Sequence, residues 1–179
     1  MDSPPERLSS GPIELRRWHA ADAELCLQLV LESLDHLRPW MPWATSDYDL
    51  AAALDFVLRC EADWAAGTAF NYLFSSGGQP AGGAGLHARI DPGGLEIGYW
   101  VHPAHTGRGI ATGAAGALTA AAFALPGVDH VEIHHDSFNL ASERVPAKLG
   151  YTHVETRPQT RFERAPGDSG ISKVWRITR

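Results

Sequence analysis

The sequence predicts an α/β fold (α+β in its strand order): one mixed, mostly antiparallel sheet with a central βαβ unit and helices on both faces. Three extended segments, 70–75, 81–90 and 95–101, are separated only by short Gly- and Pro-rich turns, which is typical of an antiparallel meander. A helix over 109–124 then joins the third segment to 131–134. Such a crossover joins two parallel strands, and the connection between them is right-handed.

The remaining elements follow from hydrophobic periodicity and from turn residues. Residues 1–12 are rich in Pro, Ser and Gly and are expected to form a flexible lead-in to a single domain over 13–179. We expect further strands at 13–17, 151–155 and 173–177, helices from Asp22 to Pro39, over 48–66 and over 140–149, and a polar, mobile loop at 157–170. Pro146 falls inside the last helix and should kink or shorten it.

Composition narrows the class of partner. The chain has 179 residues, of which 44% are hydrophobic, and a formal charge of −6. This charge argues against nucleic acid or an anionic membrane as the main partner and favours a cation such as a protonated amine. Cys26 and Cys60 lie in helix-like apolar patterns and are expected to be buried free thiols, as in a reducing cytoplasm. The sequence lacks a signal-peptide core and a membrane-length apolar run, so we expect a cytoplasmic protein.

The most informative stretch is 100–113. A strand ends in a loop that opens at Gly107 and Gly109 into a helix made almost entirely of small residues. Glycines free the backbone to turn several N–H groups toward one point, and the helix N-terminus adds partial positive charge there. Together these features predict a cradle for the phosphate or pyrophosphate of a nucleotide-bearing cofactor.

Two familiar phosphate-binding motifs do not fit this stretch. A P-loop requires Gly-Lys-Ser/Thr, and no such triplet follows Gly107 or Gly109. A dinucleotide fingerprint requires a sixth-position glycine, which here is Thr112, and it normally belongs to an early βαβ unit with more parallel units behind it. A dinucleotide-dependent oxidoreductase is therefore the weakest of the functional alternatives.

Segment 106–111 resembles instead the pyrophosphate loop of the GNAT superfamily of acyl-CoA-dependent N-acyltransferases, Gln/Arg-x-x-Gly-x-Gly/Ala. Gly109 and Ala111 match, whereas Thr106 replaces the usual Gln or Arg and removes one side-chain donor. Four further segments resemble, in order, the ribosomal-protein N-terminal (alanine/serine) acetyltransferase branch: 39–43, 96–101, 139–142 and 148–151. The resemblance extends over about residues 13–177.

This resemblance implies a fold, a cofactor and a set of cofactor contacts. The strands on either side of the cradle helix would splay apart, so that the pantetheine arm of acetyl-CoA lies between them and contacts the backbone of 98–101. The implied cofactor-binding residues are Tyr99, Trp100, Val101, Thr106, Gly107, Arg108, Gly109, Ile110, Ala111, Thr112, Asn139 and Ser142. The reaction would be direct attack of an amine on the acetyl thioester.

Three residues are candidates for catalysis. Ser142 would protonate the departing thiolate, although a serine in the first turn of a helix is also explained as a cap. Tyr151 is a second candidate acid, with packing as its alternative. Glu96 would accept the proton of the amine or attract its ammonium form, although an exposed strand glutamate needs no function. Asn139 would bond the pantetheine amide or cap the same helix.

Trp40 and Trp43 are expected to wall the acceptor site, with core or dimer packing as the alternative. The chain has nine histidines, but neighbouring residues on a strand point to opposite faces, so His134 and His135 should not share a metal ion. The acceptor remains open between an α-amino group of a protein or peptide, a free amino acid, and an amine-bearing antibiotic or toxin. A non-catalytic CoA-binding domain is the alternative from another class, and a homodimer is plausible.

Overall fold

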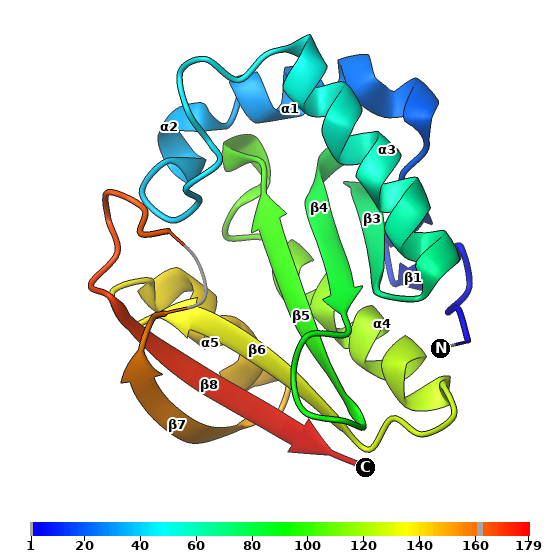
Figure 1. Ribbon diagram of the computed structural model, residues 1–179, viewed down its shortest axis with the longest axis vertical. Helices are drawn as coiled ribbons and strands as arrows, with labels where there is room; N and C mark the ends of the chain where they lie inside the picture. Colours follow the sequence, from blue (N-terminus) through cyan, green and yellow to red (C-terminus); the bar gives the residue numbers. More distant parts are fainter. Residues whose placement is uncertain (1, 161–162) are drawn as a thin grey trace.

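The computed structural model describes residues 2–160 and 163–179. Their core is one eight-stranded sheet in the order β1-β2-β3-β4-β5-β6-β8-β7 (Figure 1). β5 and β6 run parallel and flank a helical crossover, and the other neighbouring strands are antiparallel. The predicted mixed sheet with its central βαβ unit is therefore confirmed. The strands are β1 (Arg7–Ser10), β2 (Ile13–Arg17), β3 (Ala69–Ser76), β4 (Gln79–His87), β5 (Gly94–Val101), β6 (His130–Asp136), β7 (Thr152–Pro158) and β8 (Ile171–Thr178).

The lead-in differs from the expectation. Residues 7–10 form β1, which pairs with β2 along its whole length. Gly11, at φ +57°, allows the tight turn between the two strands, and Leu8 packs against the main core. The Tyr72 hydroxyl also donates a hydrogen bond of 2.8 Å to the Pro5 carbonyl. The Pro, Ser and Gly content of residues 1–12 predicted a flexible segment. Composition alone does not show these contacts with residues that are distant in the sequence.

Helices lie on both faces of the sheet, as predicted (Figure 1). Leu73 and Phe74 are neighbours on β3 and point to opposite faces, and they belong to two separate hydrophobic clusters. The Leu73 cluster is covered by α1 and α3, and the Phe74 cluster by α4. The helices are α1 (Ala23–Leu31), α2 (Leu34–Leu37), α3 (Leu50–Ala66), α4 (Ile110–Ala124) and α5 (Leu140–Lys148).

The helix boundaries follow the predicted signals with one exception. Asp49 caps α3 by accepting the Ala52 N–H at 2.9 Å, and Gly67 ends that helix at φ +69°. The single helix expected from Asp22 to Pro39 is instead divided at Ser33 into α1 and α2. Ser33 is buried there, a position that apolar periodicity alone does not reveal.

The small residues of α4 let the helix press closely onto the sheet. A side chain at Gly113 would collide with Ile13 of β2, and one at Gly116 would meet Leu149 beyond α5. The sequence predicted a helix made almost entirely of small residues, and the partners that approach it are β2 and the residue just after α5. No helix within residues 2–160 and 163–179 is both long and apolar enough to cross a membrane.

β5 and β6 separate halfway along their length. Their parallel pairing covers Gly94–Ile97 of β5 and ends at the pair Ile97 and Ile133. Beyond this point β5 remains paired with β4 through Val101, whereas β6 continues with β8 through Asp136. The sheet therefore opens from Gly98 onward, as the resemblance implied, and we call this opening the splay.

Candidate active site

The loop after β5 forms the expected cradle at the open end of the splay. Gly107 and Gly109 both have φ +74°, in the left-handed region, and Gly109 is the N-cap of α4. A β-carbon built on either glycine would meet only open space, and residues 106–109 are exposed. The first N–H groups of a helix have no acceptor within it, so Ile110, Ala111 and Thr112 present donors to this space. An anionic group fits such a position.

Thr106 and Arg108, the other predicted loop contacts, lie beside these glycines. The Thr106 hydroxyl donates to the Pro103 carbonyl at 3.0 Å, so it stabilises the turn that precedes the cradle. The Arg108 side chain is exposed at the edge of the loop, where a guanidinium can reach a bound phosphate. His102 accepts the Ala104 N–H and approaches Glu32, just after α1, at 3.1 Å, which connects the start of the loop to the rest of the domain.

Ser142 and Tyr99 meet behind the splay. Ser142 lies in the first turn of α5 and Tyr99 on β5, and their hydroxyl oxygens are 2.8 Å apart. The cap of α5 is Asn139, whose side chain accepts the Ser142 N–H at 3.1 Å. The Ser142 hydroxyl is therefore not used for capping. Burial raises the pKa of Tyr99 above its ordinary value, so this phenol keeps its proton at neutral pH.

Pro146 explains how Tyr99 reaches α5. Proline has no N–H, so the Ser142 carbonyl four residues earlier lacks its usual partner within the helix. The Tyr99 hydroxyl donates to that carbonyl at 3.1 Å. Pro146 thus does not shorten the helix, which continues to Lys148. It leaves the Ser142 carbonyl available to accept the Tyr99 hydroxyl, and this hydrogen bond holds Tyr99 beside Ser142.

Tyr151, the second candidate acid, has a different partner. Its hydroxyl is 2.6 Å from the Thr119 hydroxyl of α4, and Thr119 donates in turn to the Ala115 carbonyl. The Tyr151 proton is therefore given to Thr119. Burial raises the pKa of Tyr151 to about 12. The residue is almost fully buried in the main core, as its packing alternative expected.

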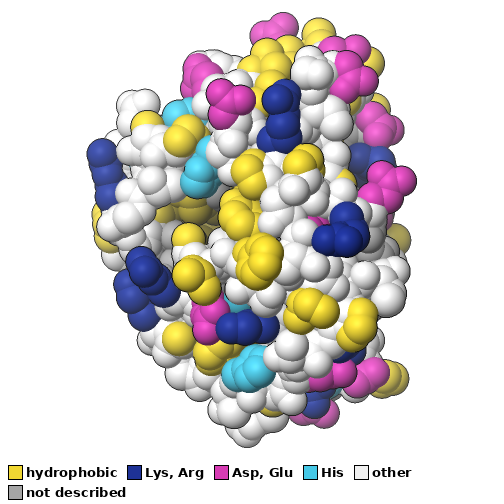
Figure 2. All heavy atoms as spheres, turned by 90° about the vertical axis from the view of Figure 1, so that its left-hand side faces the viewer, with side chains coloured by type: hydrophobic (Ala, Val, Ile, Leu, Met, Phe, Trp, Pro, Cys, Tyr) yellow, Lys and Arg dark blue, Asp and Glu magenta, His cyan; other side chains and the backbone are white. Residues whose placement is uncertain are grey.

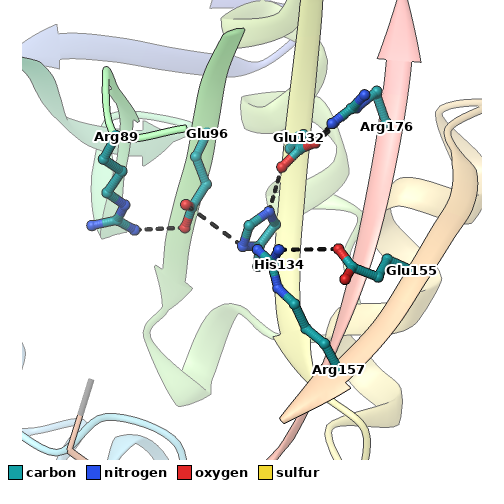
Figure 3. Close-up of polar contacts among 7 residues, drawn as sticks. All are labelled: Arg89, Glu96, Glu132, His134, Glu155, Arg157 and Arg176. Carbon is teal, nitrogen blue, oxygen red and sulfur yellow. Dashed lines mark hydrogen bonds and ion pairs between the residues drawn. The ribbon is translucent and has the colours of Figure 1, made fainter. Parts of the chain in front are cut away.

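Glu96 is part of an ionic network on the face of the sheet opposite to Tyr99 and Ser142 (Figure 3). It is 4% exposed, accepts a hydrogen bond of 2.7 Å from Arg89, and lies 3.6 Å from His134 of β6. His134 also contacts Glu132 at 2.6 Å, and Arg176 of β8 binds the other oxygen of Glu132 at 2.7 Å. Burial alone would raise the pKa of Glu132, but the hydrogen bonds from His134 and Arg176 lower it to about 2.

His87 lies beside this network at the point where the splay begins. It ends β4 and is the register partner of Glu96 on β5, so the two side chains share one face. A β-carbon built on Gly98 would lie 3.5 Å from His87 Nε2, which places the imidazole over the first residue of the splay. Burial, assisted by the charge of Arg89 and opposed by Glu96, lowers the pKa of His87 to about 4.

Trp43 borders the same face. Trp43 is 42% exposed, and its ring lies 6.4 Å from that of Trp100 on β5 and 6.0 Å from that of Tyr48. Trp40 is half-buried in the loop after α2. The Pro39 carbonyl of that loop accepts the Gly167 N–H at 2.9 Å, which connects it to the segment before β8. Of the predicted mobile loop 157–170, residues 161 and 162 lie outside the described residues.

Hydrophobic side chains surround a hollow on the side of the molecule that carries α5 and β7 (Figure 2). Among residues 2–160 and 163–179, no group of three or more His, Cys, Asp and Glu side chains is arranged to hold a metal ion. His134 and His135 have separate partners, Glu132 and Trp175.

Comparison with known proteins identifies the family. Residues 13–152 match the family model described as the acetyltransferase (GNAT) domain, so the chain belongs to this family of acetyltransferases. A search of curated proteins found no match.

Solved structures share the fold at low sequence identity. RimL, a ribosomal L7/L12 α-N-protein acetyltransferase solved with coenzyme A, superimposes with a TM-score of 0.85 at 22% identity, covering 99% of this chain and 98% of RimL. The microcin C7 self-immunity acetyltransferase MccE, solved with acetyl-CoA and AMP, gives 0.85 at 18% identity, covering 94% and 93%. The ribosomal-protein-S5-alanine acetyltransferase from Vibrio fischeri gives 0.83 at 15% identity, covering 96% of each chain.

Sequence reasoning missed part of the site. It placed Tyr99 among backbone contacts of the cofactor, whereas its hydroxyl is the partner of Ser142. It gave no role to His87, Arg89 or His134, which surround Glu96. The available signal was the strand register: once the meander was predicted, the residue opposite Glu96 followed from the length of the turn at 91–94.

Proposed function

We propose that this acetyltransferase moves the acetyl group of acetyl-CoA to the α-amino group of a protein or peptide. The observation that supports this function most strongly is the alignment of the cradle with the splay. Gly109 heads α4 at the end where β5 and β6 have separated, so a ligand bound there by its diphosphate can extend its arm between the two strands.

The pantetheine arm of acetyl-CoA would occupy the position of a neighbouring strand beside β5. From Gly98 to Val101, β5 pairs with β4 on one side, and alternate backbone groups face the gap on the other. The pantetheine amides can bond to these groups, and the Asn139 amide nitrogen remains to assist because only its oxygen serves as the helix cap. This arrangement brings the thioester to the closed end of the splay, near Gly98.

The leaving thiolate needs a proton, and the Ser142–Tyr99 pair is suited to supply it. The two hydroxyls are hydrogen-bonded to each other and lie on the face of the sheet that carries α4 and α5. Because Tyr99 donates to the Ser142 carbonyl, the Ser142 hydroxyl donates to Tyr99 in the free protein. We propose that Tyr99 positions this hydroxyl and that Ser142 turns its O–H from Tyr99 to the sulfur when the thiolate forms. Tyr151 is less suited to the role, because it is almost fully buried in the main core.

The acceptor would approach from the other face, where Trp43 and Trp100 offer flat apolar surface beside Gly98. A peptide N-terminus fits this open border, and the structural neighbours named as ribosomal-protein acetyltransferases, one of them an α-N-protein acetyltransferase, favour the same class. MccE has the same fold, so small-molecule amines belong in the test.

The test follows thiol release by the purified protein with acetyl-CoA and a panel of amines. The panel contains peptides that begin with Ala or Ser, the same peptides with blocked termini, free amino acids and an aminoglycoside. We expect turnover with the free-terminus peptides alone. Preference for a small molecule would move the acceptor to the antibiotic or toxin class. Tight acetyl-CoA binding without any transfer would instead support a non-catalytic CoA-binding domain.

The location of the protein and its oligomeric state remain proposals. We propose a cytoplasmic location, supported by two buried free cysteines, Cys26 and Cys60. We also propose that the protein forms a homodimer, which light scattering at several concentrations can test.

A further inference from the structure

Two polar groups border the closed end of the splay from opposite faces of the sheet. Gly98 and Tyr99 are consecutive on β5, so their outward directions are opposite. Tyr99 points toward α5 and Ser142, whereas the front of Gly98 lies beneath the His87 imidazole. A thioester held beside Gly98 would therefore have hydroxyls behind it and an imidazole in front of it.

The carboxylate predicted to act as base is already engaged. Glu96 holds an ion pair with Arg89 at 2.7 Å and approaches His134 at 3.6 Å, and His134 is bound in turn to Glu132 and Arg176. Each of the two carboxylates thus has an arginine partner, Arg89 for Glu96 and Arg176 for Glu132. Such a network fixes the position of Glu96 and engages its carboxylate oxygens with Arg89 and His134.

We propose, on the basis of the acetyl transfer proposed above, that His87 takes the proton from the attacking amine and that Glu96 stabilises the imidazolium that forms. His87 is the side chain nearest the front of Gly98, at 3.5 Å from the position of a β-carbon there. Its register pairing with Glu96 sets carboxylate and imidazole side by side. This is the division of roles between an acid–base imidazole and its orienting carboxylate.

The proposed step balances as follows. The neutral amine nitrogen attacks the acetyl carbonyl carbon, and an N–C bond forms while an N–H proton moves to His87 Nε2. The C–S bond breaks, and its electron pair leaves on sulfur, which takes a proton from Ser142. His87 returns its proton to solvent, and water restores the proton of the Ser142–Tyr99 pair. The products are the amide and free coenzyme A.

Burial keeps His87 in the neutral form that accepts a proton. Glu96 of β5 and Arg89 just after β4 face it directly, and His134 of β6 lies beyond Glu96. Because burial lowers the pKa of His87 to about 4, its imidazole is neutral at pH 7. Glu96 favours the imidazolium at the moment when the amine nitrogen becomes positively charged and its proton becomes acidic.

The first test compares His87→Gln with two other variants in the peptide assay. Removing a general base costs about 100- to 1000-fold in kcat. We expect this loss for His87→Gln, with affinity for acetyl-CoA within about twofold of the starting protein. Glu96→Gln should lose about tenfold, because it removes only the counter-ion. His36→Gln, at an exposed histidine of α2, is the matched control and should keep full activity.

Retention of activity by His87→Gln within about threefold would overturn the proposal, and so would a larger loss for Glu96→Gln than for His87→Gln. The second test is independent of turnover. With histidines labelled at Cε1, acetyl-CoA should shift the His87 NMR signal, which is assigned by its loss in His87→Gln. An unshifted His87 signal in a protein that binds acetyl-CoA would also overturn the proposal. Binding without transfer to any amine would contradict the proposed function instead, and the NMR measurement would still decide where His87 lies.

Discussion

The cofactor side and the acceptor side of the splay are built in different ways. The cofactor side consists of consecutive backbone: two glycines at φ +74° and the first turn of α4. The acceptor side consists of side chains brought from separate strands, with His87, Glu96, His134 and Arg176 each on a different strand. A local backbone motif can be read directly in a sequence, whereas a cluster assembled across four strands depends on their register.

The strongest prediction addresses the cofactor side. Gly109→Asp places a side chain at a left-handed φ and a negative charge where the diphosphate would bind. We expect affinity for acetyl-CoA to fall by about 100-fold or more, as measured by titration calorimetry. Gly127→Asp is the matched control, because Gly127 also has a left-handed φ of +77° and open space around it but lies beyond the far end of α4. Equal losses of affinity in both variants would show that strain alone, rather than the cradle, had been measured.

Variants of the Ser142–Tyr99 pair test the proposed protonation of the leaving thiolate. Ser142→Ala keeps the backbone N–H that Asn139 caps, so the helix should remain intact. We expect kcat to fall by about 10- to 100-fold while the affinity for acetyl-CoA is unchanged. Tyr99→Phe should give a smaller loss in the same direction. Tyr151→Phe serves as the comparison and should stay within about threefold, because Tyr151 bonds to Thr119. An equal loss of turnover and acetyl-CoA binding in Ser142→Ala would assign this serine a structural role.

Gly98→Ala probes the acceptor side without disturbing the fold. The new methyl group would meet His87 at 3.5 Å and 3.8 Å, which are ordinary contacts, and Gly98 does not have a left-handed φ. The methyl group would occupy the space between the imidazole and the strand edge. We expect kcat/KM for the peptide to fall by about tenfold, with binding of acetyl-CoA retained. Unchanged kinetics for the peptide would place the acceptor elsewhere.

The smallest expected effect is on acid stability. The pKa of Glu132 is about 2 in the folded protein, compared with an ordinary value of 4.5. The folded state therefore binds this proton less readily than the unfolded state, so the stability gained is present above pH 4.5 and is lost as pH falls toward 2. Glu132→Gln should lower Tm at pH 7 by a few degrees and weaken the dependence of Tm on pH between about 5 and 2. Parallel melting curves for the two proteins would argue that the network contributes nothing.

The same contrast explains how much could be predicted. The meander, the crossover helix and the cradle depend on local turns and periodicity, and each was found within a few residues of its predicted place. β1 was missed because its partner is set by the packing of Leu8 and Tyr72 rather than by composition. The link between Pro146 and Tyr99 was missed for a similar reason, because an unpaired carbonyl becomes informative only when its distant partner is known.

Amide hydrogen exchange with and without acetyl-CoA tests the central claim most directly. If the diphosphate lies on the cradle and the arm lies in the splay, protection should increase at the first amides of α4 and at alternate amides of 98–101, while β3 stays unchanged. Protection confined to the cradle, or absent from both segments in a protein saturated with acetyl-CoA, would contradict the proposed placement of the cofactor.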